Sequence, residues 1–546
     1  MSCWPGSESG SQALPEVPTR ERVLGRPSWD PRSQPCIPTV ALDGATAHHS
    51  LRAVFAEADR LSAISCATPG ETVAVIEFLL AICFASGTCP ADADEWRTWI
   101  TEARALDSAA EWLAAQPADA WDLFHPEFPL GQNALLRQDL DAHGTGTAQL
   151  VIEHTGDYSQ LFDHHHLERD DPLPAADAFR AMLTQHVYAP SGRARMSGER
   201  LGASVTNLSA GRLLGRVRVV ALGRTLGETL RLNLYPPEGP SGPLNTSWTT
   251  AGIERRTFEA KAKPRAPRDA ADLHSALGRS IALRPKRAPG GQLVVDRVLI
   301  GAGEVLALDP ERHLQDAVFR QTTNGLSKPL WPSHTRALWQ DAHALYGAVR
   351  EAGSGLYARL RSLPYTRRGP GAPYQMWAVG LLANKSLPVA WTQGTYPYAP
   401  GLARHLHHAS YRGSVVAEHV ADSLKRAAIV AAEIVYPAAH ATDEGGKVAR
   451  FDARWTFWPA AAQPFYELLD EVVERGAFDD DDPVSEPLIE YARTLLASAR
   501  THLGNCLDSL PPNDRGHRAR ARAEQRFEKD MNHQKVPELR GEIAHD

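Results

Sequence analysis

The sequence of 546 residues lacks the short motifs that mark many large enzymes. It contains no GxxxxGK[ST] phosphate loop, no HExxH zinc motif and no GxSxG nucleophile elbow. The stretch HGTGTAQ (143–149) has two glycines but not the third that a dinucleotide-binding loop needs. These absences favour a recognition scaffold over a catalyst, so we expect no catalytic residues and no cofactor.

Paired cysteines, long apolar runs and a signal peptide are also missing. The six cysteines, at 3, 36, 66, 83, 89 and 506, form no CxxC pair, so reduced structural thiols are expected. The longest apolar stretch, VAVIEFLLAICFA (73–85), contains a glutamate and is too short to span a bilayer. The polar N-terminus has no apolar core of a signal peptide, which predicts a cytoplasmic protein with no membrane partner.

Excess charge of either sign is small. The net charge is −7, from 58 Lys and Arg against 65 Asp and Glu, which excludes a histone-like polycation. Local basic strips matter more than the total for nucleic-acid binding, however. A chain of this length is expected to hold two or more domains.

The pattern along the chain predicts an α+β protein, a large mixed N-terminal domain followed by a C-terminal four-helix bundle. We expect a flexible extension over 1–34, the α+β domain over 35–404 and the bundle over 405–546. The bundle rests on helical apolar stripes at 414–436, 455–474 and 488–507 and on a basic helical segment at 517–531.

Within the N-terminal domain, several segments have clear local signals. TPGETVAVIEFLLAICF predicts a buried helix capped by Thr68, with Pro69 at its first position and Glu71 completing a capping box. Further helices are expected over 50–64 and 172–188, a strand and turn over 36–44, and a strand then a helix over 217–237. Hairpins are expected over 293–308 and 376–393, and a long loop over 137–172.

The stretch LFDHHHLERDD (161–171) places three histidines beside acidic residues. Consecutive side chains point in different directions, so at most two of the three histidines could converge on one metal ion. A polar loop that caps the next helix explains the same residues, as does a loop that contacts phosphates or bases. The rival hypothesis is a metal-dependent hydrolase that uses His154, His164 and His166 with Asp157 or Asp163.

Basic residues gather in four strips, at 191–200, 254–268, 278–291 and 358–369. In an otherwise acidic protein, several such strips in expected loops favour contacts with phosphates. Glycines in these loops also allow backbone amides to approach an anion or a groove.

The order of segments resembles the large-subunit family, CasA, of the type I-E CRISPR surveillance complex Cascade. The resemblance runs in patches from about 36 to 510 and is most specific in WDLFHPEFPLGQ (121–132), which is similar to the family's Leu-Phe-His-Pro-Glu-x-Pro-Phe-x-Gln motif. The segments that carry the remainder are CIPTVALDGATAHHSLRAVFAEADRLSAI, TPGETVAVIEFLLAIC, LFDHHHLERDDPLPAADAFRAMLTQHVYAPSG, LGETLRLNLYPP and FWPAAAQPFYELL.

The resemblance implies a non-catalytic, DNA-binding subunit. Its expected partners are the CRISPR guide RNA, double-stranded target DNA, other Cascade subunits and a helicase–nuclease. Such a subunit reads a short protospacer-adjacent motif, largely from the minor groove, and starts strand separation. The stretch LFDHHHLERDD matches a loop near guide RNA and target DNA, which implies no metal. A scaffold that binds only proteins remains a third alternative.

Three DNA-contacting devices of the family can be carried over to this sequence. The motif-reading glycine loop is similar to Ala189, Pro190, Ser191, Gly192 and Arg193. The lysine finger is expected in LRPKRAPGG, at Lys286 with Arg287 second. The wedge that opens the duplex is expected in FRQTTNGLSK, at Gln321, Thr322, Thr323 and Asn324.

Overall fold

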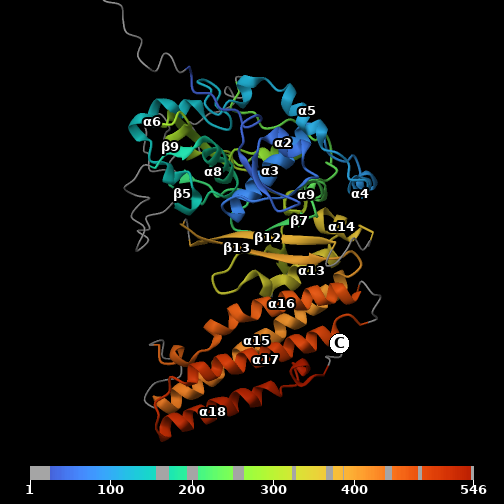
Figure 1. Cartoon of the computed structure of the whole chain (residues 1–546), viewed down its shortest axis with the longest axis vertical. Coiled ribbons are helices and arrows are strands. Elements are labelled where there is room, and N and C mark those ends of the chain that lie inside the picture. Colours follow the sequence, from blue (N-terminus) through green and yellow to red (C-terminus); the bar gives the residue numbers. More distant parts are fainter. Residues whose placement is uncertain are drawn as a thin grey trace, which may run out of the picture.

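A region of small sheets and helices lies above a bundle of long helices, as Figure 1 shows. The computed structural model describes residues 25–154, 171–193, 207–249, 263–321, 327–364, 373–384, 387–436, 446–476 and 482–542. None of the helices in these ranges combines the length and the apolar character needed to cross a lipid bilayer. The predicted α+β class with a C-terminal bundle is confirmed.

The helix α3 (Pro69–Ala85) is the buried centre of the upper region. Thr68 caps it by accepting a hydrogen bond from the Glu71 amide (3.2 Å), as the sequence predicts. The Glu71 carboxylate differs from the expected capping box because it accepts from the amide of Ala67, one residue further upstream (3.0 Å). Every residue from Gly70 to Phe84 is buried, so apolar side chains face all directions.

The helices around α3 are mostly short. They are α2 (Leu51–Ala56), α4 (Ala93–Thr101), α5 (Asp107–Ala115), α6 (Arg137–His143), α8 (Ala175–Tyr188), α9 (Leu226–Asn233), α11 (Ala270–Ser275) and α12 (Pro310–His313). Two more helices, α13 (Ala342–Glu351) and α14 (Gly355–Arg361), bury their apolar side chains in the core shared with the bundle instead. The expected long loop over 137–172 is wrong at its start, because α6 and two short 3-10 turns occupy 137–154. The prediction of a helix over 172–188 is confirmed by α8.

Two three-stranded sheets belong to this upper region. The first has the order β2 (Thr46–His49), β1 (Ile37–Ala41), β3 (Leu61–Ile64), and the second has the order β4 (Leu173–Pro174), β9 (Leu293–Ala302), β8 (Arg279–Arg287). The predicted helix over 50–64 is therefore wrong in its second half, because pairing with β1 makes β3 a strand. The hairpin predicted over 293–308 is also wrong, since β9 pairs with the upstream strand β8.

A third sheet, of order β13 (Leu387–Tyr398), β12 (Tyr374–Asn384), β7 (Arg218–Leu222), separates two hydrophobic cores. Met376 and Ala378 of β12 belong to the core shared with the bundle, and Val379 and Leu381 belong to the core around α3. This alternation is the period of two that a strand imposes. The hairpin predicted over 376–393 is confirmed.

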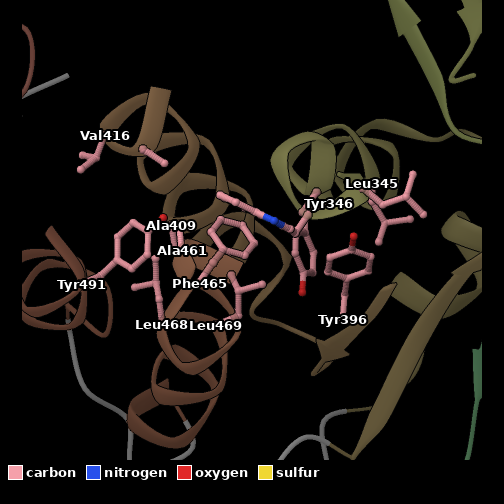
Figure 2. Packing of buried hydrophobic residues seen from close by; sticks show 14 of the residues in the cluster. Leu345, Tyr346, Tyr396, Ala409, Val416, Ala461, Phe465, Leu468, Leu469 and Tyr491 are labelled. Carbon is pink, nitrogen blue, oxygen red and sulfur yellow. The ribbon is translucent and has the colours of Figure 1, made fainter. Parts of the chain in front are cut away.

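The bundle consists of α15 (Ala403–Val435), α16 (Arg454–Gly476), α17 (Ser485–Leu507) and α18 (Asp514–Met531). Buried alanines along α15 and Gly413 let its neighbours approach closely, since a Cβ at Gly413 would lie 3.1 Å from Leu468. Figure 2 shows Phe465, Leu468 and Leu469 of α16 in this core.

The bundle is joined to the third sheet by aromatic side chains. Tyr346 of α13 donates a hydrogen bond to the Pro397 carbonyl (2.7 Å), and the rings of Tyr396 and Tyr466 lie 5.8 Å apart. The same core therefore continues across the predicted domain border at 404, next to the start of α15. The division into three domains stays a prediction.

The predicted flexible extension over 1–34 lies outside the described residues up to 24. From 25 onward the chain is packed. Arg32 is buried and donates hydrogen bonds to the carbonyls of Leu113 (2.9 Å) and Gln116 (2.7 Å), and Trp29 donates its amide to Asp122 (2.9 Å). These contacts fix residues 25–34 against α5 and the segment that follows it.

Candidate nucleic-acid interface

The expected glycine loop follows directly after α8, and we call residues 189–193 the α8 turn. Ala189 is fully buried, and its carbonyl accepts a hydrogen bond from the Gly211 amide (2.8 Å). Gly192 and Arg193 form the short strand β5 (Gly192–Arg193), which pairs with β6 (Asn207–Leu208). The turn is therefore the base of a two-stranded ladder. Ala189 is buried, whereas residues 190–192 are half-buried and partly open to the surface.

Arg279, at the start of β8, holds the α8 turn in place. Its guanidinium donates to the carbonyls of Pro190 (2.6 Å), Ser209 (2.7 Å) and Gly278 (2.9 Å). Burial lowers the pKa of Arg279 to about 10, so the side chain is still charged at neutral pH. The sequence analysis included Arg279 in a basic strip but gave it no role. Its partners Ser209 and Pro190 lie 70 and 89 positions away in the sequence, and no local pattern indicates such contacts.

The expected lysine finger lies at the other end of β8, near the turn that joins β8 to β9. We call β8 and β9 the finger hairpin. The Lys286 side chain is 61% exposed, and its Nζ lies 3.6 Å from Asp296. Arg287 donates to the Gly291 carbonyl (3.4 Å), and Gly291 has a φ of +85° that suits this tight turn.

Asp296 is shared between two cations of the finger hairpin. Arg284 donates to Asp296 (2.8 Å) and to Asp141 (2.8 Å), so its guanidinium is occupied. Partial burial would raise the pKa of Asp296, but Arg284 and then Lys286 hold that pKa below its ordinary value. Among these cations, the Lys286 ammonium is the more exposed and is the better placed to meet a phosphate.

The finger and the α8 turn are not adjacent. Arg279, which touches the turn, and Lys286 are seven residues apart on one strand, or roughly 23 Å at about 3.3 Å per residue. That separation corresponds to about seven base pairs along B-DNA. The two devices can therefore contact one duplex but not the same base pair.

Of the expected wedge, only Gln321 belongs to the part of the chain that the structure describes. Gln321 is the last residue of β10 (Phe319–Gln321), which pairs with β11 (Ser327–Pro329). Thr322, Thr323 and Asn324 lie outside the described residues. The base of the hairpin is anchored to β7 and to the residue before it, because the Val219 amide donates to the Asp316 carbonyl (3.0 Å) and the Val217 amide to the Leu330 carbonyl (3.0 Å).

Many cations of the four basic strips already have acceptors within the fold. Arg265 and Arg268 both bond to the buried Asp272, at 2.6 and 3.1 Å. Arg361 donates to three backbone carbonyls near the end of α13, and Arg359 lies over aromatic rings. Arg265, Arg268 and Arg361 therefore already have acceptors inside the fold, and the expectation that these strips contact phosphates stays a prediction. Arg195, Arg200, Arg367, Arg368 and residues 254–262 lie outside the described residues.

The histidine run and most of the rival metal site also lie outside the described residues. These include Asp157, Asp163, His164, His165 and His166. His154 ends a 3-10 turn at Ile152–His154. Where the structure describes the chain, no group of three or more His, Cys, Asp or Glu side chains is placed to hold a metal ion.

The WDLFHPEFPLGQ segment anchors the finger hairpin. The Gln132 side chain donates to the Leu123 carbonyl (2.6 Å) and accepts from the Leu283 amide (3.0 Å), and the Asn133 amide donates to the Ile281 carbonyl (2.8 Å). His125 accepts from the amides of Glu127 (3.2 Å) and Phe128 (2.9 Å). The polar side chains Gln132 and His125 thus hold the main chain of this segment and of β8 in place.

Comparisons with known proteins agree with this architecture. The family profile "CRISPR-associated protein Cse1" matches residues 33–501. A search of curated protein sequences finds no significant match.

Solved structures share the fold over almost the whole chain. CRISPR-associated protein Cse1 from Acidimicrobium ferrooxidans matches with a TM-score of 0.72 and 22% identity, covering 93% of this chain and 98% of that one. CasA (Cse1) from Thermus thermophilus matches with a TM-score of 0.70 and 18% identity, covering 92% and 98%. A chain of a "CRISPR RNA-guided surveillance complex" matches with a TM-score of 0.65 and 20% identity, covering 92% and 100%.

CasA and Cse1 are two names for one family, so the resemblance drawn from the sequence is confirmed. With the profile matched over 33–501 and the fold shared along the chain, this protein belongs to the CRISPR-associated protein Cse1 (CasA) family.

Proposed function

We propose that this chain is the non-catalytic large subunit of an RNA-guided surveillance complex of the CRISPR type I-E class. In this role it reads a protospacer-adjacent motif on duplex DNA, starts strand separation and helps to recruit a helicase–nuclease. Its partners are the guide RNA, the target duplex and the other Cascade subunits. Family membership supports the proposal, as does the shared fold with a chain of a surveillance complex.

The exposed ammonium of Lys286 is the observation that carries the DNA-binding part. It projects from the end of the finger hairpin, on a strand whose other end is fixed by Arg279 and whose middle is fixed by Gln132. A rigid base with an exposed positive tip suits a contact to phosphates or to the minor groove. Arg287, one residue further on, supports the same surface.

The other two devices have separate tasks in this proposal. The α8 turn, from Pro190 to Arg193, reads the flanking motif through its backbone and Arg193. The wedge, from Gln321 to Asn324, enters the opened duplex, where it offsets lost stacking of about 1.4 kcal/mol per base-pair step. The separation of Arg279 and Lys286 along β8 supports contacts of the finger and the turn to different parts of the duplex.

Binding of the assembled complex to motif-bearing duplex tests this proposal. Lys286→Ala removes one phosphate contact, so we expect affinity to fall about fivefold, as loss of about 1 kcal/mol implies. The slope of log K against log salt should shrink by about 0.9, since one fewer counterion is released. Guide-RNA association should not change.

Arg52→Ala is the charge-matched control, because Arg52 is an exposed cation on α2, away from the finger hairpin in sequence. It should leave both the affinity and the salt slope unchanged. Equal behaviour of the two variants would refute the role of Lys286.

A further inference from the structure

A small hollow opens between β7, α9, α11, α12 and α14, apart from the three proposed DNA-contacting devices. It is a small cavity of about 30 Å³ that is partly open to solvent. Asp316 is the one acidic residue among the described residues that line it. The basic side chains of its lining are Arg212, Arg218, Arg312, Arg359, His274 and His313.

Glu77, at the centre of α3, is fully buried below this hollow. Its carboxylate accepts hydrogen bonds from Arg212, from Arg218 (3.0 Å) and from His274 (2.7 Å). Burial alone would raise the pKa of Glu77, but Arg212, His274 and Arg218 hold that pKa well below its ordinary value. The negative charge of Glu77 is therefore fully engaged.

Asp316 is engaged as well. It lies 2.7 Å from Arg218 and 3.2 Å from Arg216. Arg212, Arg216, Arg218 and Arg359 thus supply four guanidinium groups to a cluster that contains two carboxylates. Positive charge exceeds negative charge inside the fold, and burial of uncompensated charge is costly.

Arg359 is the cation without a carboxylate partner among the described residues. Its guanidinium carbon lies 5.9 Å from the Trp96 ring centre and 5.4 Å from that of Tyr235. Its buried Nε has no hydrogen-bond partner, and neither do Nε and Nη2 of Arg216. Burial lowers the pKa of Arg359 to about 10, which leaves it charged at neutral pH.

We infer that this hollow binds a phosphoryl group, either as inorganic phosphate or as the terminal phosphate of an oligonucleotide. A dianion balances the excess charge, and its oxygens accept from the planar fork of donors that arginine presents. The aromatic rings leave no slot for a base, because Phe84 packs 4.8 Å from Tyr235 and 5.5 Å from His274. This site is independent of the proposed DNA-reading surface.

Calorimetric titration of the full chain with inorganic phosphate, against chloride at matched ionic strength, tests the inference. We expect the wild type to bind phosphate and Arg359→Met to bind it about 10- to 100-fold more weakly, since a hydrogen bond to a charged group is lost. Arg450→Met is the matched control, because Arg450 also lies over an aromatic ring (Phe451, 5.7 Å) but in the bundle. Its phosphate affinity should equal that of the wild type.

Arg312→Ala is the second variant, in case Arg359→Met does not fold. Arg312 is 60% exposed at the rim of the hollow and pairs with the exposed Glu238, so its loss leaves the fold intact. Phosphate affinity should fall about three- to tenfold. Absence of phosphate binding by the wild type at ~10 mM, or unchanged affinity in the folded variants, would overturn the inference.

Oligonucleotides with a 5′-phosphate or a 5′-hydroxyl then separate the two sources of the ligand. If the 5′-phosphorylated oligonucleotide competes with inorganic phosphate and the 5′-hydroxyl oligonucleotide does not, the ligand of the hollow is the phosphorylated end of a nucleic acid. Phosphate binding without any such competition assigns inorganic phosphate. A third outcome would contradict a specific site. In it, both oligonucleotides compete with inorganic phosphate, and Arg450→Met and Arg359→Met weaken this competition equally.

Discussion

Replacing Arg279 with methionine should loosen the α8 turn without disturbing the bundle. Methionine fills much of the buried volume but donates no hydrogen bond, so the carbonyls of Pro190, Ser209 and Gly278 lose their guanidinium donor. A buried acceptor left without its partner costs about 1–3 kcal/mol. Three such acceptors give a local destabilisation of about 3 kcal/mol or more.

Hydrogen–deuterium exchange of the full chain measures this effect at single segments. The reporter amides are Gly211 and Leu213, which donate to the carbonyls of Ala189 and Val187 (both 2.8 Å). A loss of 3 kcal/mol in local opening free energy speeds their exchange by about 100-fold, because each 1.4 kcal/mol is a factor of ten. Peptides from α17 should exchange as in the wild type.

Arg284→Met is the matched control on the same strand. Arg284 pairs with Asp296 and Asp141 at the surface, where such pairs contribute about 1 kcal/mol or less. It should leave the exchange of Gly211 and Leu213 unchanged. If Arg279→Met also leaves these amides protected, or accelerates α17 equally, the anchoring role of Arg279 is refuted.

Two further changes probe the core around α3. Glu77→Gln leaves Arg212 and Arg218 without their buried carboxylate and should destabilise the fold by about 3–5 kcal/mol in denaturant unfolding. Because the folded pKa of Glu77 is lowered, its contribution is present above its ordinary pKa and is lost as pH falls through the folded value. The wild type should therefore lose stability on acidification more steeply than Glu77→Gln, and parallel pH curves would contradict this. Thr68→Ala removes the cap of the Glu71 amide and should cost about 1 kcal/mol, whereas Thr68→Ser should cost less.

Local signals explain which elements could be predicted from the sequence. The N-terminus of α3 was predictable because Thr68, Pro69 and Glu71 act within one helical turn. The bundle was predictable because its apolar stripes repeat along long helices. The strand β3 was missed because LSAI also fits a helical stripe, and only pairing with β1 decides its conformation.

The candidate site divides in the same way. The exposure of Lys286 follows from a basic, proline- and glycine-containing turn, which the sequence shows. The pairing of Arg265 and Arg268 with Asp272 could not be predicted from the sequence, because Asp272 becomes buried only in the folded chain. The sequence shows how many cations there are, whereas the fold decides which of them remain available to a phosphate.

The motif that identifies the family and the surface proposed to bind DNA meet on one strand. Gln132 of that motif and the following Asn133 bond to Leu283 and Ile281, in the buried first half of β8. Pro285 follows at a bulge and has no amide to donate, so these contacts stop there and the strand becomes more exposed toward Lys286. The segment that resembles the family motif thus fixes the strand whose distant end is proposed to bind DNA.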